Sequence, residues 1–366
     1  MRIAVVSTTT YSAPPLSYGG EVFYWHLARG LCELGHDVTL YGAPGSKLPH
    51  NNCRCRLKYF PGTYGRIDVG REHDGATWYY HEILANDLVV DCSHNHFIAE
   101  TAGWYHRGQD DQKILVVLNG VTSNTPRCGP YNTVVGSEFW KKLLLMGRTQ
   151  FFGTSFADAM GISLVAIPPK HFAGVIHWAT DTNFYVPSPT KDDYFLWLSR
   201  PTAYKGLSDA LEIAAWHKLH LKIVPGLGNA AHEEEFKSFE KGITLANNAG
   251  ARIEVVTLPL DSTHHQKKRE LYQKAKALLY PIKSHEPFGL TVIEALSCGT
   301  PVLTYDMGAM PEILQPGVTG YICENLNEMI ESIEEVSKLS PEACRADAEK
   351  RWHYTRAAKE YAALIE

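Results

Sequence analysis

The first forty or so residues follow a strand–loop–helix–strand pattern, and this pattern constrains the fold more than any other feature of the chain. Residues 3–6 form an apolar run of the length of a buried parallel strand. After a loop rich in Thr, Ser, Pro and Gly, residues 21–34 have the periodicity of an amphipathic helix, which Gly35 ends. Residues 37–41 supply the second strand of a βαβ unit. Further strands are predicted at 88–90, 113–118 and 133–135. This alternation predicts an α/β fold with a doubly wound parallel sheet.

The second half of the chain repeats this architecture. A polar, Pro-rich stretch without periodicity at 181–190 is typical of a linker. The length of 366 residues also exceeds what one hydrophobic core usually supports. We therefore expect two Rossmann-like domains that face each other across a cleft. Beyond the linker, strands are predicted at 194–198, 221–224, 252–256, 277–280 and 301–304, with a helix at 207–217. The predicted boundaries are an N-terminal domain at 1–180, the linker at 181–190, a C-terminal domain at 191–345, and a C-terminal helix at 346–366 that packs back on the N-terminal domain.

Charge and cysteine content exclude several classes of partner and site. Lys and Arg number 35 against 40 Asp and Glu, a formal net charge of −5, so the chain has no general attraction for nucleic acid or anionic lipid. No apolar run approaches the roughly 18 residues of a membrane span, so we expect no transmembrane segment, while peripheral membrane contact stays open. Of the eight cysteines, only Cys53 and Cys55 are close, without a second pair at zinc-like spacing. We expect reduced thiols and a cytoplasmic protein.

The strongest functional signal is the segment SHEPFGLTVIEALSCGTPV at 284–302, which begins just after a predicted strand. Ligands of open parallel sheets bind beyond the carboxyl ends of the strands, where helix N-termini present free backbone N–H groups. Gly289 and Leu290 lie at the start of a predicted helix, where a phosphate can approach the amides because glycine has no side chain. Glu286 lies in the loop before this helix and Glu294 lies inside it. Two carboxylates so placed can bind two hydroxyl-bearing parts of one ligand.

The pattern E-P-F-G-L-x-x-x-E-A, followed by G-x-P-V, resembles the E-x7-E motif of retaining glycosyltransferases of family 4, which have the GT-B fold. The resemblance implies that Glu286 contacts the transferred sugar and that Glu294 holds the ribose hydroxyls of the nucleotide. The segment LWLSRPTAYKG is similar to the family's G-R-x-x-x-x-K-G, whose Arg and Lys hold the donor diphosphate, with Ser199 in place of the usual glycine. Arg200 and Lys205 can together neutralise the charge that develops on a diphosphate leaving group.

Two further matches lie in the N-terminal half. The segment PPLSYGGE before the first helix resembles the family's glycine-rich loop, in which Gly19 and Gly20 let the backbone approach the donor phosphate and the acceptor. The segment DCSHNH at 91–96 resembles the family pattern D-x-x-H-x-H. This resemblance selects His96 as the histidine that hydrogen-bonds a sugar hydroxyl, whereas His94 is expected to be structural.

The resemblance implies an enzyme that moves a hexose-type sugar from a nucleoside-diphosphate sugar to a hydroxyl acceptor, which is a saccharide, a lipid or a small molecule, with retention at the anomeric carbon. The sequence contains no D-x-D triplet. That fits a metal-independent site, and no cofactor is expected besides the nucleotide-sugar substrate. The implied catalytic residues are Glu286, His96, Arg200 and Lys205. The implied donor-binding residues are Gly19, Gly20, Arg200, Lys205, Leu258, Glu286, Phe288, Gly289, Leu290, Thr291 and Glu294.

Four other functions compete with this interpretation. The segment GLGNAA at 226–231 formally fits the G-x-G-x-x-A fingerprint of a nicotinamide-linked oxidoreductase, but it follows the second strand of its domain, whereas that fingerprint belongs to the first βα turn. A glycoside hydrolase would use Glu286 and Glu294 as acid and nucleophile, and the phosphate-binding features would then have no purpose. A sugar-nucleotide epimerase of related fold and a non-catalytic nucleotide-sugar-binding subunit remain as alternatives.

Overall fold

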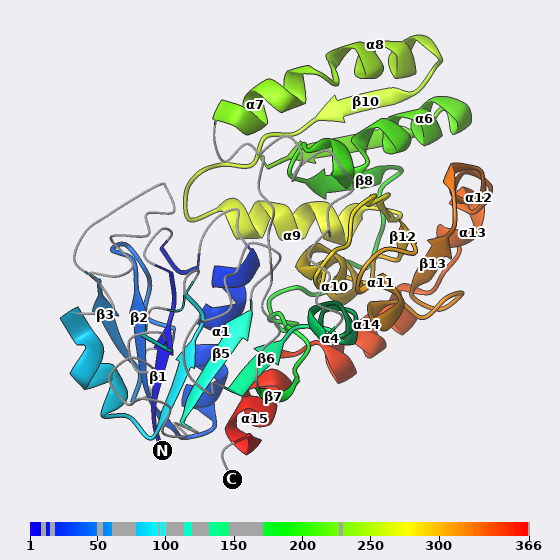
Figure 1. The fold of residues 1–366 in the computed structure, drawn as a ribbon. Helices are drawn as coiled ribbons and strands as arrows, with labels where there is room; N and C mark the ends of the chain where they lie inside the picture. The colour runs from blue at the N-terminus through cyan, green and yellow to red at the C-terminus, as the bar shows by residue number, and fades with distance from the viewer. Residues whose placement is uncertain are drawn as a thin grey trace. The chain divides into compact units, whose positions relative to one another are not determined.

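A computed structural model describes residues 1–8, 12–14, 19–49, 54–60, 78–93, 96, 98–99, 113–118, 132–145, 171–226 and 230–364 (Figure 1). The chain forms two compact units. Unit 1 comprises Met1–Thr180 together with Tyr354–Glu366, and unit 2 comprises Asp181–His353. None of the helices in the described part of the chain combines the length and the apolarity that a membrane crossing requires.

Unit 1 is built on a seven-stranded sheet in the order β3-β2-β1-β4-β5-β6-β7, in which every pair of neighbours is parallel. The order reverses direction between β1 and β4, as it does in doubly wound folds. The strands are β1 (Arg2–Val6), β2 (Asp37–Gly42), β3 (Arg56–Tyr59), β4 (Leu88–Asp91), β5 (Ile114–Leu118), β6 (Asn132–Val135) and β7 (His171–Val175). The helices of this unit include α1 (Gly19–Glu33), α4 (Glu138–Leu145) and α15 (Tyr354–Ala363).

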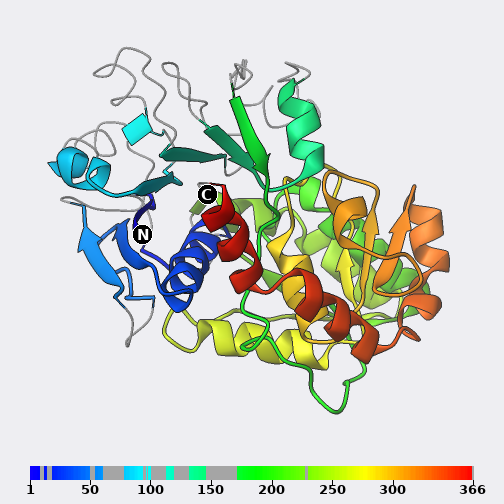
Figure 2. The ribbon, with the colours of Figure 1, turned by 90° about the horizontal axis from the view of Figure 1, so that it is seen from below.

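Helix α15 packs against α1, so the last described helix of the chain completes unit 1 (Figure 2). The two helices come close at Gly30, where an added Cβ would lie 2.8 Å from the Cβ of Ala358. The ring of Tyr354 stacks on His26, and its hydroxyl donates to the carboxylate of Glu33 at 2.9 Å. The segment 346–366, expected to be one helix, contains the end of one helix and the whole of α15, with a break at 352–353.

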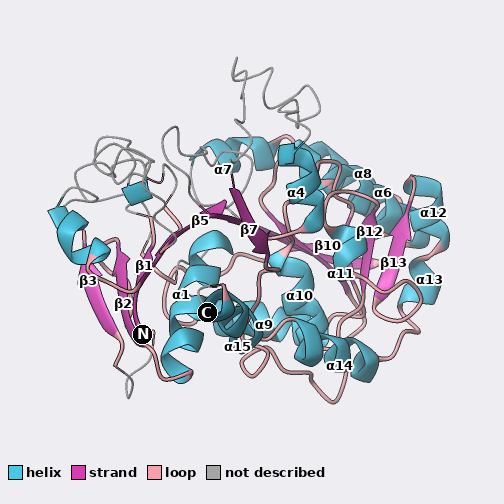
Figure 3. Ribbon diagram, turned by 60° about the horizontal axis from the view of Figure 1, so that its bottom comes forward, coloured by secondary structure: helices cyan, strands magenta, loops and turns pink. Residues whose placement is uncertain are grey.

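Unit 2 is built on a six-stranded parallel sheet in the order β10-β9-β8-β11-β12-β13. Its strands are β8 (Phe195–Ser199), β9 (His220–Pro225), β10 (Arg252–Val255), β11 (Leu278–Tyr280), β12 (Val302–Tyr305) and β13 (Gly320–Cys323). Its helices are η1 (Ala203–Lys205), α6 (Leu207–His217), α7 (Ala230–Lys237), α8 (Glu240–Asn248), α9 (His264–Lys274), α10 (Leu290–Ser297), α11 (Met310–Ile313), α12 (Leu326–Glu331), α13 (Ile333–Val336) and α14 (Pro341–Arg351). A buried core joins the sheet to α6, α8, α12 and α13, and α9, α10 and α14 cover its other face (Figure 3).

The prediction of an α/β fold with a doubly wound parallel sheet in each half is confirmed. The helix predicted at 207–217 is observed with these bounds, and the helix predicted to start near Leu290 is α10. Three strands were not predicted, namely β3, β7 and β13, and all three are edge strands. An edge strand is covered on fewer sides than a central one, and its sequence therefore lacks a continuous apolar run. In β3, for example, Arg56 and Tyr59 are exposed.

Candidate functional site

The two strongest sequence motifs leave the sheet of unit 2 at its topological switch point. Strand β8 has β9 on one side and β11 on the other, so the strand order reverses there. Arg200 directly follows the last residue of β8, and Glu286 lies in the loop between β11 and α10. In open parallel sheets the crevice outside this point is where ligands bind. The segment after β9, which carries Gly226 of the competing dinucleotide fingerprint, lies one strand away from it.

Lys205, Tyr280 and Glu286 form a partly buried cluster at this point. The Nζ of Lys205 lies 2.5 Å from Oε2 of Glu286, and the side chains of the two residues are 9% and 15% exposed. The hydroxyl of Tyr280 donates to the same Oε2 at 2.9 Å and accepts from Lys205 Nζ at 3.3 Å. The first and second motifs, separated by about eighty residues in the sequence, are therefore joined through one carboxylate oxygen.

The neighbours of Glu286 keep its carboxyl ionised. Burial alone would raise the pKa of Glu286, but the charge and hydrogen bond of Lys205, the hydroxyl of Tyr280 and the charge of Arg200 outweigh burial, so the pKa lies below its ordinary value. Arg200 itself is exposed. A guanidinium near the cluster that is open to solvent is available to an anionic ligand.

The backbone around Glu286 is held by the loop after β12. The amide of Ala309 donates to the carbonyl of Glu286 at 3.0 Å. Gly308 has a φ of 63°, and a Cβ there would lie 2.2 Å from the carbonyl oxygen of Glu286. Only glycine combines this left-handed backbone with so close an approach. The carbonyl oxygen of Glu286 is thus packed against the backbone of Gly308. Helix α11 follows directly after this loop.

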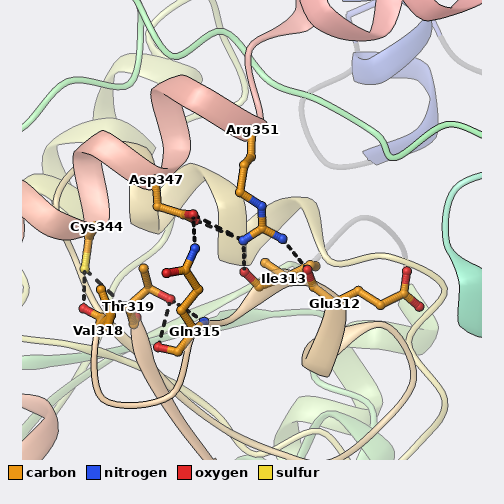
Figure 4. Close-up of polar contacts among 8 residues, drawn as sticks. All are labelled: Glu312, Ile313, Gln315, Val318, Thr319, Cys344, Asp347 and Arg351. Atoms are coloured by element: carbon orange, nitrogen blue, oxygen red, sulfur yellow. Dashed lines mark hydrogen bonds and ion pairs between the residues drawn. The ribbon is translucent and has the colours of Figure 1, made fainter.

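Helix α14 holds the far end of α11. The guanidinium of Arg351 donates to the carbonyl of Ile313 at 2.9 Å and to the carbonyl of Glu312, and it pairs with Asp347 at 3.2 Å (Figure 4). Asp347 also accepts from the side-chain amide of Gln315 at 2.6 Å. An arginine at a helix C-terminus satisfies carbonyl groups that have no partner within the helix. The segment that supports Glu286 is therefore held at Ala309 by the backbone of Glu286 and at Ile313 by Arg351.

A second glycine brings the loops of β8 and β11 together. Gly206 precedes α6 with a φ of 72°, and a Cβ there would lie 1.8 Å from the carbonyl oxygen of Pro281. The amide of Lys283 donates to the carbonyl of Tyr204 at 2.8 Å. The indole of Trp197 donates to the carbonyl of Lys205 at 3.2 Å. These contacts fix the backbone from which Lys205 reaches Glu286.

Glu294 has an environment that parallels that of Glu286. It lies inside α10 and is 2% exposed. Its Oε2 lies 2.6 Å from Nζ of Lys268 and accepts from the hydroxyl of Tyr272 at 3.2 Å. Gly289 is the N-cap of α10 with a φ of 112°, and a Cβ there would lie 2.7 Å from the side chain of Met310. Each glutamate is thus held on one oxygen by a lysine and a tyrosine.

The other donor-binding candidates of unit 2 differ in exposure. Phe288 is fully buried and packs edge-on against Trp352 with ring centroids 5.7 Å apart, so its side chain belongs to the core. Leu290 is 9% exposed at the first position of α10. Thr291 and Leu258 are half-buried, and Leu258 lies beyond the edge strand β10. Phe288 and Leu290 therefore have most or all of their side chains inside the protein.

The candidates of unit 1 lie at the switch point of its own sheet, after β1 and β4. Gly19 and Gly20 are the first residues of α1, which corrects the expectation that they form a loop before it. His96 is fully buried with a φ of 51°, and its Nδ1 lies 3.7 Å from Oδ1 of Asp91. Neither ring nitrogen of His96 makes a hydrogen bond to another described residue. His94 lies outside the described residues.

Asp91 is the charged partner of His96. Burial raises the pKa of Asp91, but His96 and the hydrogen bonds from Ser93 outweigh burial, and the pKa lies below its ordinary value. Its Oδ1 accepts from the hydroxyl of Ser93 at 2.6 Å, and its Oδ2 accepts from the amide of Ala99 at 3.3 Å. A buried carboxylate with these partners holds the turn that carries His96.

Three residues that contact the glutamates were not predicted, namely Tyr280, Lys268 and Tyr272. Lys268 and Tyr272 are four residues apart in a helix, which places them on one face. That spacing is visible in the sequence, but nothing in it says which face meets α10. Within the described ranges, no group of three or more His, Cys, Asp and Glu side chains is arranged to hold a metal ion.

Comparison with known proteins gives the family of unit 2. Residues 180–360, which include all of unit 2, match the family described as glycosyl transferases group 1. Unit 2 is a glycosyltransferase group 1 domain. Over 359 residues the chain is 27% identical to an uncharacterized glycosyltransferase of Methanocaldococcus jannaschii, a match that covers 87% of this chain and 84% of that protein.

Solved structures match the fold of the whole chain, and they confirm the predicted GT-B class. The sucrose-phosphate synthase of Thermosynechococcus elongatus matches with a TM-score of 0.70 at 17% identity, covering 100% of this chain and 98% of that one. Anabaena HepE in complex with UDP-glucose matches with a TM-score of 0.67 at 15% identity, covering 98% of both chains. At these identities the likeness concerns the fold alone.

Proposed function

We propose that this glycosyltransferase is a retaining enzyme of the family 4 type, which transfers a hexose-type sugar from a nucleoside-diphosphate sugar to a hydroxyl acceptor. One observation carries the proposal. Lys205 and Glu286, from motifs on two different strands, meet within 2.5 Å at the switch point of unit 2. The helix that follows Glu286 carries Glu294, whose charge is also neutralised by a lysine.

In the proposed reaction the donor diphosphate lies between cationic side chains and a helix N-terminus. Arg200 and Lys205 would stabilise the charge that develops on the leaving group, together with the amides at Gly289 and Leu290. Glu286 would hold the transferred sugar, and Glu294 would hold the ribose. The bond between the anomeric carbon and the phosphate oxygen breaks, and a bond to the acceptor oxygen forms on the same face of the sugar. The acceptor proton passes to the departing phosphate oxygen.

Unit 1 would supply the remaining contacts of the proposed reaction. Gly19 and Gly20 at the start of α1 would let a phosphate or the acceptor approach the backbone, because glycine has no side chain. His96 would donate to or accept from a sugar hydroxyl, since its two ring nitrogens have no hydrogen-bond partner among the described residues. We further propose that the enzyme needs no metal ion, because Arg200, Lys205 and the helix terminus can neutralise the diphosphate.

The proposed compartment is the cytoplasm. Cys32, Cys55, Cys92, Cys298, Cys323 and Cys344 are buried free thiols. Thiols persist in a reducing compartment, whereas exported proteins usually form disulfides. The proposed acceptor is a hydroxyl group of a saccharide, a lipid or a small molecule.

A thermal-shift screen of nucleotide sugars tests the donor class. UDP-glucose is the first probe because a solved relative in fold binds it, followed by ADP-glucose and GDP-mannose. We expect one donor to raise the unfolding temperature of the wild type and to have no effect on Glu294→Ala. Glu335→Ala, which removes an exposed carboxylate on α13, should respond like the wild type. If no nucleotide sugar stabilises the wild type, the proposal is wrong.

Product analysis then tests the reaction. Release of free nucleotide should require a hydroxyl acceptor, and NMR of the product should show the donor's anomeric configuration. An epimerase would instead alter the sugar without acceptor, a hydrolase would release nucleotide or sugar to water, and a binding subunit would do neither. Activity in the presence of EDTA checks the metal independence.

A further inference from the structure

The arrangement around Glu294 points beyond a simple ligand-binding carboxylate. Lys268 and Tyr272 lie one turn apart on α9, and α9 packs against α10 (Figure 1). The Nζ of Lys268 lies 2.6 Å from Oε2 of Glu294, and the Tyr272 hydroxyl donates to that same oxygen at 3.2 Å. One oxygen of the carboxylate is therefore occupied by two donors from one helix face, and Oε1 takes part in neither contact.

This cluster is shielded from water. The side chains of Lys268 and Glu294 are 15% and 3% exposed, and Tyr272 is fully buried. Burial and the charge of Glu294 hold the pKa of Tyr272 well above its usual value, so its hydroxyl keeps its proton and donates to the carboxylate. Tyr185 packs edge-on against Tyr272 with ring centroids 6.1 Å apart, which restricts the ring. Burial, the charge of Glu294 and a hydrogen bond with that carboxylate hold the pKa of Tyr185 well above its usual value, so Tyr185 also faces Glu294.

A buried ion pair of this kind is a costly way to stabilise a fold. The desolvation of both charges offsets much of their attraction, and apolar side chains of similar size often stabilise a protein as well or better. The same pair does fix the direction of a carboxylate. A side chain held in one geometry binds a ligand group without losing rotamer freedom at that moment.

We propose that Lys268 and Tyr272 are positioning residues for the nucleotide ribose: they hold Oε2 of Glu294 and thereby present Oε1 to a ribose hydroxyl. This inference rests on the proposed function, in which Glu294 binds the ribose. Its consequence is a preference for ribonucleotides over deoxyribonucleotides, because a nucleotide without the hydroxyl removes that donor from Oε1 in a water-poor site.

Binding of nucleoside diphosphates by calorimetry tests the inference. UDP, ADP and GDP are first titrated into the wild type to find the one that binds, and the 2′-deoxy and 3′-deoxy forms of that nucleotide are then compared with it. We expect at least one deoxy form to bind the wild type about tenfold or more weakly. In Tyr272→Phe and Lys268→Met this penalty should fall to about two- to threefold, mainly because the ribonucleotide binds less well.

Tyr194→Phe is the matched control. Tyr194 is buried, and its hydroxyl donates at 2.7 Å to the carbonyl of Leu271 on the same helix, so the variant removes a hydroxyl without touching a carboxylate. This variant should bind the deoxy nucleotide as much more weakly than the ribonucleotide as the wild type does. Because a purely structural role would lower the unfolding temperature of the variants without changing the ratio of the two affinities, that ratio is the deciding measurement.

The outcomes separate the two proposals. If none of the three nucleotides binds the wild type, the proposed function fails and this inference fails with it. If one binds but both variants keep the wild-type penalty, only the positioning role is overturned. Tyr272→Phe decides the matter alone if Lys268→Met does not fold, since the phenylalanine preserves the packing of the ring.

Discussion

Tyr280 illustrates how single residues tune the candidate site. Its ring is buried at the end of β11, and its hydroxyl lies between Lys205 and Glu286. Burial, together with the charge and hydrogen bond of Glu286, holds the pKa of Tyr280 well above its usual value, so it remains a hydrogen-bond donor. A neutral donor strengthens the charge-assisted contact to the carboxylate without adding another charge.

Tyr280→Phe should therefore lower kcat by about 10- to 100-fold, because a hydrogen bond to a charged group contributes on the order of 1.5–3 kcal/mol. The shape of the ring is kept, and the stability of the fold should change by about 1 kcal/mol. Steady-state kinetics with the identified donor provide the measurement. Tyr305→Phe is the control, since that hydroxyl donates at 2.5 Å to the carboxylate of Asp209, which is not a candidate site residue. Equal losses of activity in both variants would contradict the role of Tyr280.

Gly308 supports Glu286 through the backbone. In Gly308→Ala the new Cβ would collide with the carbonyl oxygen and the amide nitrogen of Glu286, at 2.2 and 2.4 Å. The loop must then shift, and a displacement of about 1 Å at a reacting group can cost about 100-fold in rate.

Gly317→Ala separates this collision from backbone strain. Gly317 has a similar φ of 75°, but an added Cβ would meet nothing within 4 Å. The control should lose about 1–2 kcal/mol of stability from the left-handed backbone and keep its activity. Denaturant unfolding and turnover, measured on both variants, give the comparison. An active Gly308→Ala enzyme would show that Glu286 tolerates the shift.

At the scale of elements, Lys191 joins the start of unit 2 to the carboxyl end of α10. Its Nζ donates to the hydroxyl of Thr300 at 2.6 Å and to the carbonyl of Cys298 at 3.3 Å. Burial lowers the pKa of Lys191 to about 8, although the nearby thiols of Cys298 and Cys344 partly oppose this effect. Folding therefore disfavours the charged form of Lys191 relative to its neutral form.

The contribution of Lys191 to the free energy of unfolding should become more favourable as the pH rises. Below about pH 8 the folded and unfolded chains both bind the proton, and the cost of burying the charge is fully present. Between about pH 8 and the ordinary value of 10.5, the unfolded chain binds more protons than the folded one, so the cost is progressively relieved. Urea unfolding of wild type and Lys191→Met at pH 7.5 and roughly 9.5 should show the wild type gaining relative to the variant. A difference that does not change with pH would argue against the buried charge.

At the scale of the whole molecule, the chain crosses from unit 1 to unit 2 after Thr180 and returns after His353. Helix α15 therefore belongs to the core of unit 1 although it is the last described helix in the sequence. Tyr361 on this helix is fully buried, and its ring lies 6.3 Å from that of Phe23 on α1. The stability of unit 1 therefore depends on a helix that follows unit 2 in the sequence.

Tyr361→Ala should destabilise unit 1 by about 3–5 kcal/mol, the usual cost of truncating a large buried aromatic side chain. Thermal unfolding followed by tryptophan fluorescence is the measurement, and Trp178 of unit 1, which stacks on Phe23 at 5.6 Å, is a reporter. Trp216→Ala, which removes an aromatic ring that is 72% exposed on α6, should change stability by less than about 0.5 kcal/mol. Equal effects of the two variants would mean that α15 does not contribute to the core.

The sequence alone predicts the two parallel sheets, all of their central strands, and the loops and helices that carry Arg200, Lys205, Glu286 and Glu294. These follow from local patterns, since apolar runs, helical periodicity and glycine positions act over a few residues. The edge strand β3 was not predicted because it is only partly buried and therefore does not require a run of apolar residues.

Which side chains meet depends on how the strands and helices pack. Lys205 reaches Glu286 because β8 and β11 are neighbours in the sheet, and Lys268 reaches Glu294 because one face of α9 packs on α10. The same holds for α15, whose place in unit 1 depends on its packing against α1. Contacts of this kind depend on strand order and on the faces that helices bury, and neither is written in the local pattern of one segment.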